Sequence, residues 1–301
     1  MGNQEIIYSM TMFKNYLSLV KFSHTIFAMP FAMIGYFTAV LRTGHGFSWS
    51  TFALVIGCMV FARSAAMAFN RWLDAHFDAL NPRTAIREIP AGIISRSSAL
   101  WFVIVCCGLF IVCTALINPL CLSLSPVALF VVLFYSYTKR FTALCHLVLG
   151  VGLSLAPIGA YLAVTGTFAW LPILFSFAVV FWVSGFDVIY ALQDESFDKA
   201  QRLHSLPAAY GVRKALRLSE LLHVLSAASV IAAGIYGHFG VCYWIGVAIF
   251  VSMLFMQHRL VKPGDLSRVN LAFMTTNGIA SVVFSLFVVA DMFLFRAAPV
   301  I

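Results

Sequence analysis

The chain has 301 residues, of which 62% are hydrophobic and 10% are charged, and its formal net charge is +8. Soluble domains carry about 25% charged residues, so this composition excludes an ordinary soluble domain and indicates an integral membrane protein. The basic charge does not indicate a nucleic-acid partner, because the Lys and Arg residues collect in loops on one side of the predicted topology. The seven cysteines form no Cys-x-x-Cys pair, so neither a disulfide framework nor a zinc site is indicated.

Nine apolar runs predict membrane-spanning helices, since a run of about 18 or more apolar residues is long enough to cross a bilayer. In chain order they cover residues 22–41, 51–69, 98–117, 120–136, 144–164, 169–189, 218–237, 240–257 and 271–295. The first run is longer than a signal-peptide core and has no small-residue cleavage site, so we expect it to be retained. We expect an all-α integral membrane fold that forms a single membrane-embedded domain over residues 1–301.

The positions of the Lys and Arg residues predict the orientation in the membrane. Almost all of them fall on one side of the nine-span topology; Arg42 and Arg296 fall on the other, and Arg63 lies within a span. Positively charged loops are retained in the cytoplasm. The N-terminus is therefore predicted to be cytoplasmic, as are the loops after the second and sixth spans.

Two short patches, which are these two loops, hold seven of the 11 acidic residues. The first, NRWLDAHFDALNPRTAIREIPAG, covers residues 70–92, and the second, DVIYALQDESFD, covers residues 187–198. In the first patch Asn70, Asp74 and Asp78 are spaced four apart, which places them one turn apart on one helical face.

The second patch repeats this spacing with Tyr190, Asp194 and Asp198, and Asp187 lies one turn before Tyr190. Four spans separate the patches, and an even offset predicts a parallel repeat about an axis along the membrane normal. We expect two four-helix repeats, at about residues 22–136 and 144–257, followed by a ninth helix at about 271–295. The two patches then face each other across one cavity.

Carboxylates in pairs at a membrane surface need compensation, because a bare Asp near the bilayer centre costs about 2.5–3.5 kcal/mol. A divalent cation is the simplest candidate, and oxygen ligands without His or Cys at ligand spacing favour Mg²⁺ over zinc. Mg²⁺ is typically held by one or two carboxylates together with substrate phosphates, so the patches predict a phosphate-bearing substrate at the cytoplasmic face. The alternative is that the acidic residues are solvated loop charges, an interpretation that the matched pair of patches disfavours.

These motifs resemble those of the UbiA superfamily of intramembrane prenyltransferases. The family pattern Asn-x-x-x-Asp-x-x-x-Asp after the second helix is matched by NRWLDAHFDALNPRT, and the Asp-x-x-x-Asp pattern after the sixth by DVIYALQDESFDKAQRLHSLPAAYG. The segments KFSHTIFAMPFA and YSYTKRFT are also similar to family segments. The resemblance covers nearly the whole chain and implies nine helices.

The resemblance also implies the chemistry. Mg²⁺ is expected to bind the diphosphate of a polyprenyl diphosphate; the allylic C–O bond breaks, and an aromatic acid acceptor attacks the carbocation. The expected metal ligands are the four motif aspartates, Asp74, Asp78, Asp194 and Asp198. Asn70 is expected to orient Asp74 or to touch the diphosphate.

Basic residues near the motifs are expected to bind the diphosphate oxygens, namely Arg71, Lys139 and Arg140. Lys139 and Arg140 also fit the role of topology anchors. Arg63 lies inside a span, seven residues before Asn70, where ionisable residues are functional candidates. It is expected to bind the diphosphate or the acceptor's carboxylate, with a structural ion pair as the alternative.

The acceptor is expected to contact Asp187, Tyr190 and His24. Asp187 alternatively supports the second metal site, and His24 alternatively makes a structural hydrogen bond within the bundle.

Around both motifs the chain looks most like bacterial quinone-pathway members that act on 4-hydroxybenzoate or on a dihydroxynaphthoate. Many benzoate-type members have Arg-Pro-Leu-Pro-Ser-Gly where this chain has REIPAG at residues 87–92. This difference slightly favours a larger, bicyclic acceptor. The expected location is the bacterial inner membrane, with the active site facing the cytoplasm. Two rival classes are a secondary transporter with a parallel repeat and a CDP-alcohol phosphotransferase; the second is disfavoured because the chain has no Asp-Gly dipeptide.

Overall fold

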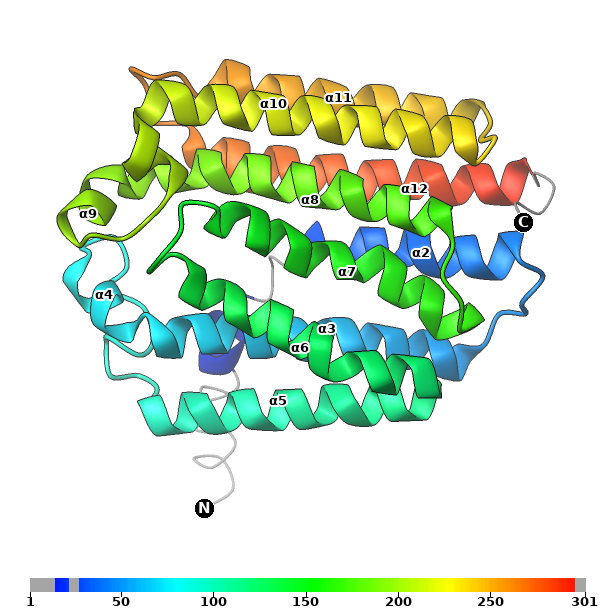
Figure 1. The fold of residues 1–301 in the computed structure, drawn as a ribbon, viewed down its shortest axis with the longest axis horizontal. Coiled ribbons are helices and arrows are strands. Elements are labelled where there is room, and N and C mark those ends of the chain that lie inside the picture. Colours follow the sequence, from blue (N-terminus) through cyan, green and yellow to red (C-terminus); the bar gives the residue numbers. More distant parts are fainter. Residues whose placement is uncertain (1–13, 22–26, 296–301) are drawn as a thin grey trace.

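The computed structural model describes residues 14–21 and 27–295, and this part of the chain is a bundle of helices (Figure 1). Eight helices in these residues are long and apolar enough to cross a membrane, and the apolar helix α2 (Met29–Arg42) is shorter, with 14 residues. The chain is thus an all-α integral membrane protein, as predicted. The beginning of the first predicted span, residues 22–26, lies outside the described residues.

The long helices follow the predicted apolar runs. In chain order they are α3 (Trp49–Leu73), α5 (Arg96–Ile117), α6 (Pro119–Thr138), α7 (Cys145–Thr165), α8 (Trp170–Ala191), α10 (Leu206–Tyr236), α11 (Val241–Leu260) and α12 (Asn277–Leu294), which the π-helix η3 (Leu271–Thr276) precedes. The largest difference is α10, which begins at Leu206 rather than near residue 218. Hydropathy detects only the apolar part of this helix, whereas its polar first turns continue beyond that part and contain a kink at Gly211.

Polar residues at the helix ends explain where several helices begin. Ser48, Ser95 and Ser205 each accept a backbone hydrogen bond in the first turn of the helix that follows. Asn118 does the same for α6, where Pro119 occupies the first helical position. Such caps satisfy N–H groups that have no partner within the helix.

Two short helices lie together at one end of the bundle, α4 (Ala75–Leu80) and α9 (Glu195–Ala200) (Figure 1). Each follows a break at a motif aspartate: the backbone angles φ and ψ are −90° and 8° at Asp74, and −105° and 5° at Asp194. Gly92 and Gly211, at matching places after the two motifs, both have positive φ, of 72° and 77°. The two motif regions therefore share a break at an aspartate and a later glycine with positive φ, and the division of the chain into two parallel repeats stays a prediction.

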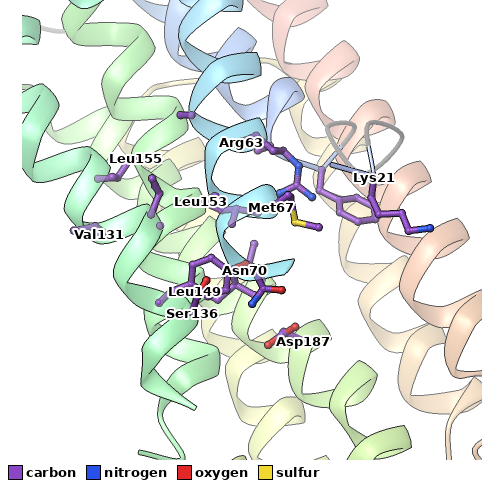
Figure 2. Close-up of a pocket in the computed structure, with 18 of the residues that line it drawn as sticks. Lys21, Arg63, Met67, Asn70, Val131, Ser136, Leu149, Leu153, Leu155 and Asp187 are labelled. Carbon is purple, nitrogen blue, oxygen red and sulfur yellow. The ribbon is translucent and has the colours of Figure 1, made fainter. Parts of the chain in front are cut away.

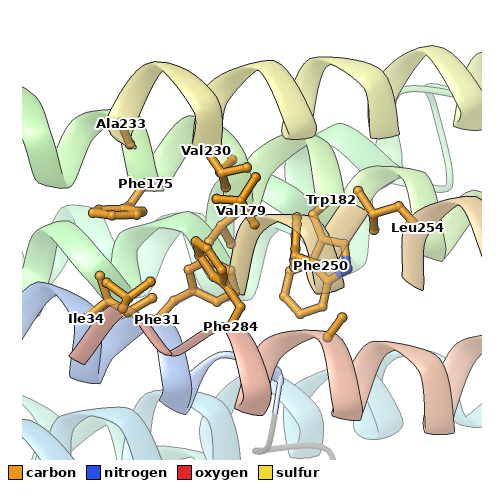
Figure 3. Close-up of a cluster of buried hydrophobic side chains, with 14 of the residues drawn as sticks. Phe31, Ile34, Phe175, Val179, Trp182, Val230, Ala233, Phe250, Leu254 and Phe284 are labelled. Atoms are coloured by element: carbon orange, nitrogen blue, oxygen red, sulfur yellow. The ribbon is translucent and has the colours of Figure 1, made fainter. Parts of the chain in front are cut away.

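A large aromatic core joins α2, α8, α11 and α12 (Figure 3). Trp182, the largest fully buried side chain, packs against Phe31 and Phe250 and donates a 2.9 Å hydrogen bond to Oδ1 of Asn277. The same oxygen accepts a 2.7 Å bond from Gln257. The side chains of this core fill the space on one side of the bundle, and the cavity described below lies on the other side.

Helix α7 packs closely against α2 and α8, two of the helices that form this core. A side chain at Gly35 of α2 would overlap the backbone carbonyl of Pro157, and one at Gly150 would overlap the carbonyl of Val180. Only glycine permits approaches this close. Helix α7 is therefore held between α2 and α8, and its remaining face is available to line a cavity.

Candidate active site

A cavity of about 1080 Å³ lies among α3, α5, α6, α7 and α8 (Figure 2). Its lining includes both Cys145, at the start of α7, and Phe168, beyond the end of that helix. Since α7 has 21 residues, the cavity extends for about 30 Å along the bundle. All the predicted site residues within the described part of the chain line it: Arg63, Asn70, Arg71, Asp74, Asp78, Lys139, Arg140, Asp187, Tyr190, Asp194 and Asp198. The remaining predicted residue, His24, lies outside the described residues.

Asp74 ends α3 and is bound by two neighbours. Arg140 donates a hydrogen bond to its Oδ1 at 3.0 Å, and Asn70 donates one to its Oδ2 at 3.1 Å. Burial raises the pKa of Asp74 to about 6, against the opposing charge of Arg140. The backbone N–H of Asp74 still donates to Asn70 and that of Asp78 to Asp74, so these three side chains remain one turn apart, as predicted.

Asp78 is buried, and only one of its two oxygens has a hydrogen-bond partner. Arg87 donates to Oδ1 at 2.6 Å, whereas Oδ2 is a buried acceptor without a donor among the described residues. A buried carboxylate oxygen without a donor is costly, so it marks a place where a further cation or donor would be favourable.

Asp194 is held by residues of the first motif loop. Arg83 donates to both carboxylate oxygens, at 3.1 and 2.6 Å, and Asn81 donates to Oδ1 at 3.1 Å. A third guanidinium N–H of Arg83 reaches the hydroxyl of Tyr190 at 3.1 Å. Burial alone would lower the pKa of Arg83, but the hydrogen bonds and charge of Asp194 outweigh it and hold that pKa above its ordinary value.

Asp198 lies at the cavity wall, yet its side chain has no exposed surface. Lys139 Nζ lies 2.7 Å from its Oδ1, and the hydroxyl of Ser205 donates to its Oδ2 at 2.8 Å. Burial alone would lower the pKa of Lys139, but the charge and hydrogen bond of Asp198 raise it above its ordinary value. Each motif aspartate is thus paired with one Arg or Lys side chain.

The two motif loops are bound to each other. Arg83 and Asn81 of the first loop hold Asp194 of the second, and the α6–α7 loop supplies the cations for one aspartate of each motif, Asp74 and Asp198. All four motif aspartates therefore lie at one charged end of the cavity that they line.

The donor chemistry of this end fits Mg²⁺ bound together with phosphate. No group of three or more His, Cys, Asp or Glu side chains in residues 14–21 and 27–295 is close enough to hold a metal ion unaided. Mg²⁺ typically takes one or two carboxylates and completes its shell with water and substrate phosphates. The four carboxylates, including the Asp78 oxygen that has no donor among the described residues, fit this way of binding Mg²⁺. The Arg and Lys side chains beside them can donate hydrogen bonds to phosphate oxygens.

Beyond this charged end the cavity wall is mostly apolar. It is formed by residues such as Val55, Met59, Phe110, Val131, Leu153 and Phe168. Arg63 and Asp187 interrupt the apolar wall, each seven residues before a motif residue and thus about 10 Å deeper in the bundle. The Nε atom of Arg63 is buried and has no hydrogen-bond partner among the described residues.

Several residues of this site were missed in the sequence. In the sequence Arg83 and Arg87 count only among the Lys and Arg residues that predict the orientation, and no motif points to Asn81, His146 or Ser205. Two of these contacts are local in the sequence, since Arg87 follows Asp78 and Ser205 follows Asp198 within the same loop. The contacts of Asn81, Arg83 and His146 join segments that are distant in the sequence.

A long, mostly apolar cavity with a charged end of aspartate, arginine and lysine has the chemistry to accept a lipid with an anionic head group. The sequence model of the UbiA prenyltransferase family matches residues 28–279. The chain therefore belongs to the UbiA prenyltransferase family, which confirms the resemblance and the assignment as an enzyme. This membership argues against the transporter and phosphotransferase alternatives.

Similar proteins agree with this assignment. The 4-hydroxybenzoate octaprenyltransferase of Nitrosospira multiformis is 31% identical over 229 residues, which cover 75% of this chain and 78% of the relative. The enzyme of the same name from Francisella tularensis subsp. novicida is 28% identical over 257 residues, 84% of this chain and 89% of that one.

Solved structures agree as well. The apo structure of a UbiA homologue from Aeropyrum pernix K1 superposes with a TM-score of 0.77 at 29% identity, over 90% of this chain and 97% of the other. A UbiA homologue from Archaeoglobus fulgidus bound to GPP and Mg²⁺ shares the fold, with a TM-score of 0.71 at 18% identity over 93% of this chain and 100% of the other.

Proposed function

We propose that this chain transfers a polyprenyl group from a polyprenyl diphosphate to an aromatic acid acceptor in quinone biosynthesis, in a reaction that requires Mg²⁺. The observation that carries the proposal is that both aspartate motifs line the same end of one cavity whose remaining wall is mostly apolar. A diphosphate head fits the charged end, and a prenyl tail gains about 0.8 kcal/mol for each CH₂ group it buries. The proposed location is the bacterial inner membrane, with the charged end on the cytoplasmic side.

The proposed metal ligands are the four motif aspartates, Asp74, Asp78, Asp194 and Asp198. When bound there, Mg²⁺ would neutralise negative charge on the diphosphate leaving group. Asn70 orients Asp74 through its 3.1 Å hydrogen bond.

The Arg and Lys side chains of the site can pair either with the aspartates or with phosphate oxygens. Lys139, Arg140, Arg83 and Arg87 neutralise the aspartates, and the same side chains donate hydrogen bonds to phosphate oxygens once the carboxylates face a metal. Arg71 is buried beside them and is a further phosphate donor in this proposal. Such donors stabilise the charge that develops on the leaving group.

The acceptor is proposed to lie deeper, between Arg63 and Asp187, with Tyr190 above it. Arg63 has an unpartnered buried N–H that suits a carboxylate of an aromatic acid. The apolar wall excludes water, which protects the allylic carbocation from hydrolysis. The names of the relatives favour 4-hydroxybenzoate as the acceptor, whereas REIPAG at residues 87–92 favours a dihydroxynaphthoate.

A product assay by mass spectrometry tests this proposal. The purified protein is offered 4-hydroxybenzoate and a dihydroxynaphthoate in separate reactions, each with a mixture of prenyl diphosphates, with Mg²⁺ or with a chelator. We expect a prenylated product with one acceptor class, only when Mg²⁺ is present. Absence of any prenylated product, or formation of product independent of Mg²⁺, would refute the proposal.

A further inference from the structure

Asp187 differs from the four motif aspartates in its partner. Each motif aspartate forms an ion pair with Arg or Lys, whereas Asp187 has no such partner among the described residues. It is paired instead with His146 of α7, whose Nδ1 lies 2.6 Å from Asp187 Oδ2. The Asp187 side chain is 24% exposed and lines the cavity (Figure 2).

His146 is held in one tautomer. Its Nε2 accepts a 3.3 Å hydrogen bond from the backbone N–H of Leu206, the first residue of α10. A backbone N–H can only donate, so Nε2 carries no proton, and the ring proton of the neutral imidazole is on Nδ1. His146 therefore donates to Oδ2 of Asp187, and its ring is anchored between α8 and the start of α10.

This arrangement leaves one carboxylate oxygen available. Oδ2 of Asp187 is fixed by the imidazole, and no donor in the described part of the chain reaches Oδ1. A charged acceptor oriented by a buried histidine, open on one side to an apolar cavity, has the form of a general base with a positioning partner.

The proposed reaction needs such a base at this depth. When the acceptor's ring carbon attacks the allylic cation, a ring π pair forms the new C–C bond, and the C–H bond at that carbon must break to return its electron pair to the ring. We infer that Oδ1 of Asp187 takes this proton and that His146 positions the carboxylate to receive it, an inference that rests on the proposed function. The carboxylate becomes a carboxylic acid, while the diphosphate leaves with the electron pair of the broken C–O bond.

The other cavity carboxylates are less suited to this step. The motif aspartates are bound by Arg or Lys at the charged end, where the diphosphate head is proposed to lie. Glu88 is buried and accepts a hydrogen bond from Ser18. Asp187 lies about 10 Å deeper than Asp194, beyond the head group and at the depth proposed for the acceptor ring.

The test uses Asp187→Asn in the full-length protein, with an acceptor deuterated at the carbon that is prenylated. Asn keeps an oxygen for the His146 N–H and the volume of Asp, so we expect an unchanged unfolding midpoint and unchanged Mg²⁺-dependent binding of prenyl diphosphate. We expect kcat to fall about 10²- to 10⁴-fold, the contribution of a general base. Because proton removal then limits the rate of Asp187→Asn, we expect the primary deuterium isotope effect on its kcat to be larger than that of the wild type.

His146 supplies the second arm of the test. His146→Ala is expected to lower kcat about ten- to a hundredfold, the loss of one hydrogen bond to a charged group, and to raise the isotope effect in the same direction. His146→Gln retains an N–H donor and is expected to recover part of the activity with the isotope effect of the wild type.

Three outcomes would overturn the assignment of the base. These are a kcat of Asp187→Asn near the wild-type value, a lowered kcat without a larger isotope effect, and a loss of prenyl diphosphate binding. The second would mean that another group takes the proton, and the third that Asp187 supports the metal site. A wild-type protein that makes no prenylated product would refute the proposed function itself, which separates the two failures.

Discussion

Replacement of Asp198 by Asn tests whether the motif loops depend on a buried charge pair. The Asp198 side chain is fully buried, with Lys139 Nζ at 2.7 Å and the Ser205 hydroxyl at 2.8 Å. Asn keeps the volume and an acceptor for Ser205 but leaves Lys139 without its counterion. Glu195→Gln is the matched control, because Glu195 lies in the same six-residue helix and pairs with exposed Lys199 at 2.7 Å.

The expected cost follows from the burial of the two partners. Breaking a buried ion pair costs about 3–5 kcal/mol, but the Lys139 side chain is 33% exposed, so water compensates part of that cost. We expect Asp198→Asn to lower the free energy of unfolding by about 1–3 kcal/mol and Glu195→Gln by at most about 0.5 kcal/mol.

Thermal unfolding of the purified protein in detergent measures this difference. For a chain of this size, 1 kcal/mol corresponds to about 2–4 °C, so the midpoint of Asp198→Asn should fall by several degrees. Transfer activity should fall by about 100-fold or more, because the residue is also a proposed metal ligand. If both variants unfold at the wild-type temperature, the Asp198–Lys139 pair does not contribute to stability. If both midpoints fall by the same amount, the burial of Asp198 is not the cause of the loss.

Three further predictions follow from other contacts. Asp74→Ala and Asp194→Ala should each abolish Mg²⁺-dependent transfer in the product assay while the protein remains monodisperse in size-exclusion chromatography; near-normal turnover in both would remove the metal role. Burial raises the pKa of Asp74 to about 6, so its carboxylate is protonated as the pH falls through that value. The Mg²⁺ concentration for half-maximal turnover should then rise roughly tenfold per pH unit below it, and a constant requirement would contradict this role. Asn277→Leu removes the acceptor shared by Trp182 and Gln257 and should cost about 1–3 kcal/mol in thermal unfolding, whereas an unchanged midpoint would show that neither donor needs it.

Much of the architecture was predictable because the bilayer imposes a simple requirement on the sequence. A segment in lipid must be apolar and helical, so the hydropathy of each run was sufficient to locate its helix. The spacing of four residues in both acidic patches was also informative, since it survives in the structure as successive helical turns from Asn70 to Asp78. The polar first turns of α10 were missed because they do not lie in the apolar run.

The partners of the aspartates were less accessible from the sequence. Arg83 pairs with Asp194 and not with an acid of its own loop, because the fold brings the two loops together. His146 is a single histidine in an apolar run, and its role depends on α8 and on the start of α10. Contacts of this kind are set by helix packing, which one sequence does not encode in any local pattern.

The π-helix η3 (Leu271–Thr276) affects which deletions the chain can accept. A π turn contains one more residue than an α turn for the same rotation, so removing a single residue here would let the segment relax to ordinary α geometry without turning the helix that follows. Each residue of an α-helix advances the azimuth by about 100°. Removing one residue from the first turns of α12 would instead rotate the rest of that helix and carry Phe284 and Val288 from the protein interior toward the lipid. A deletion of one residue is therefore expected to be tolerated between Leu271 and Thr276 and not in the helix that follows.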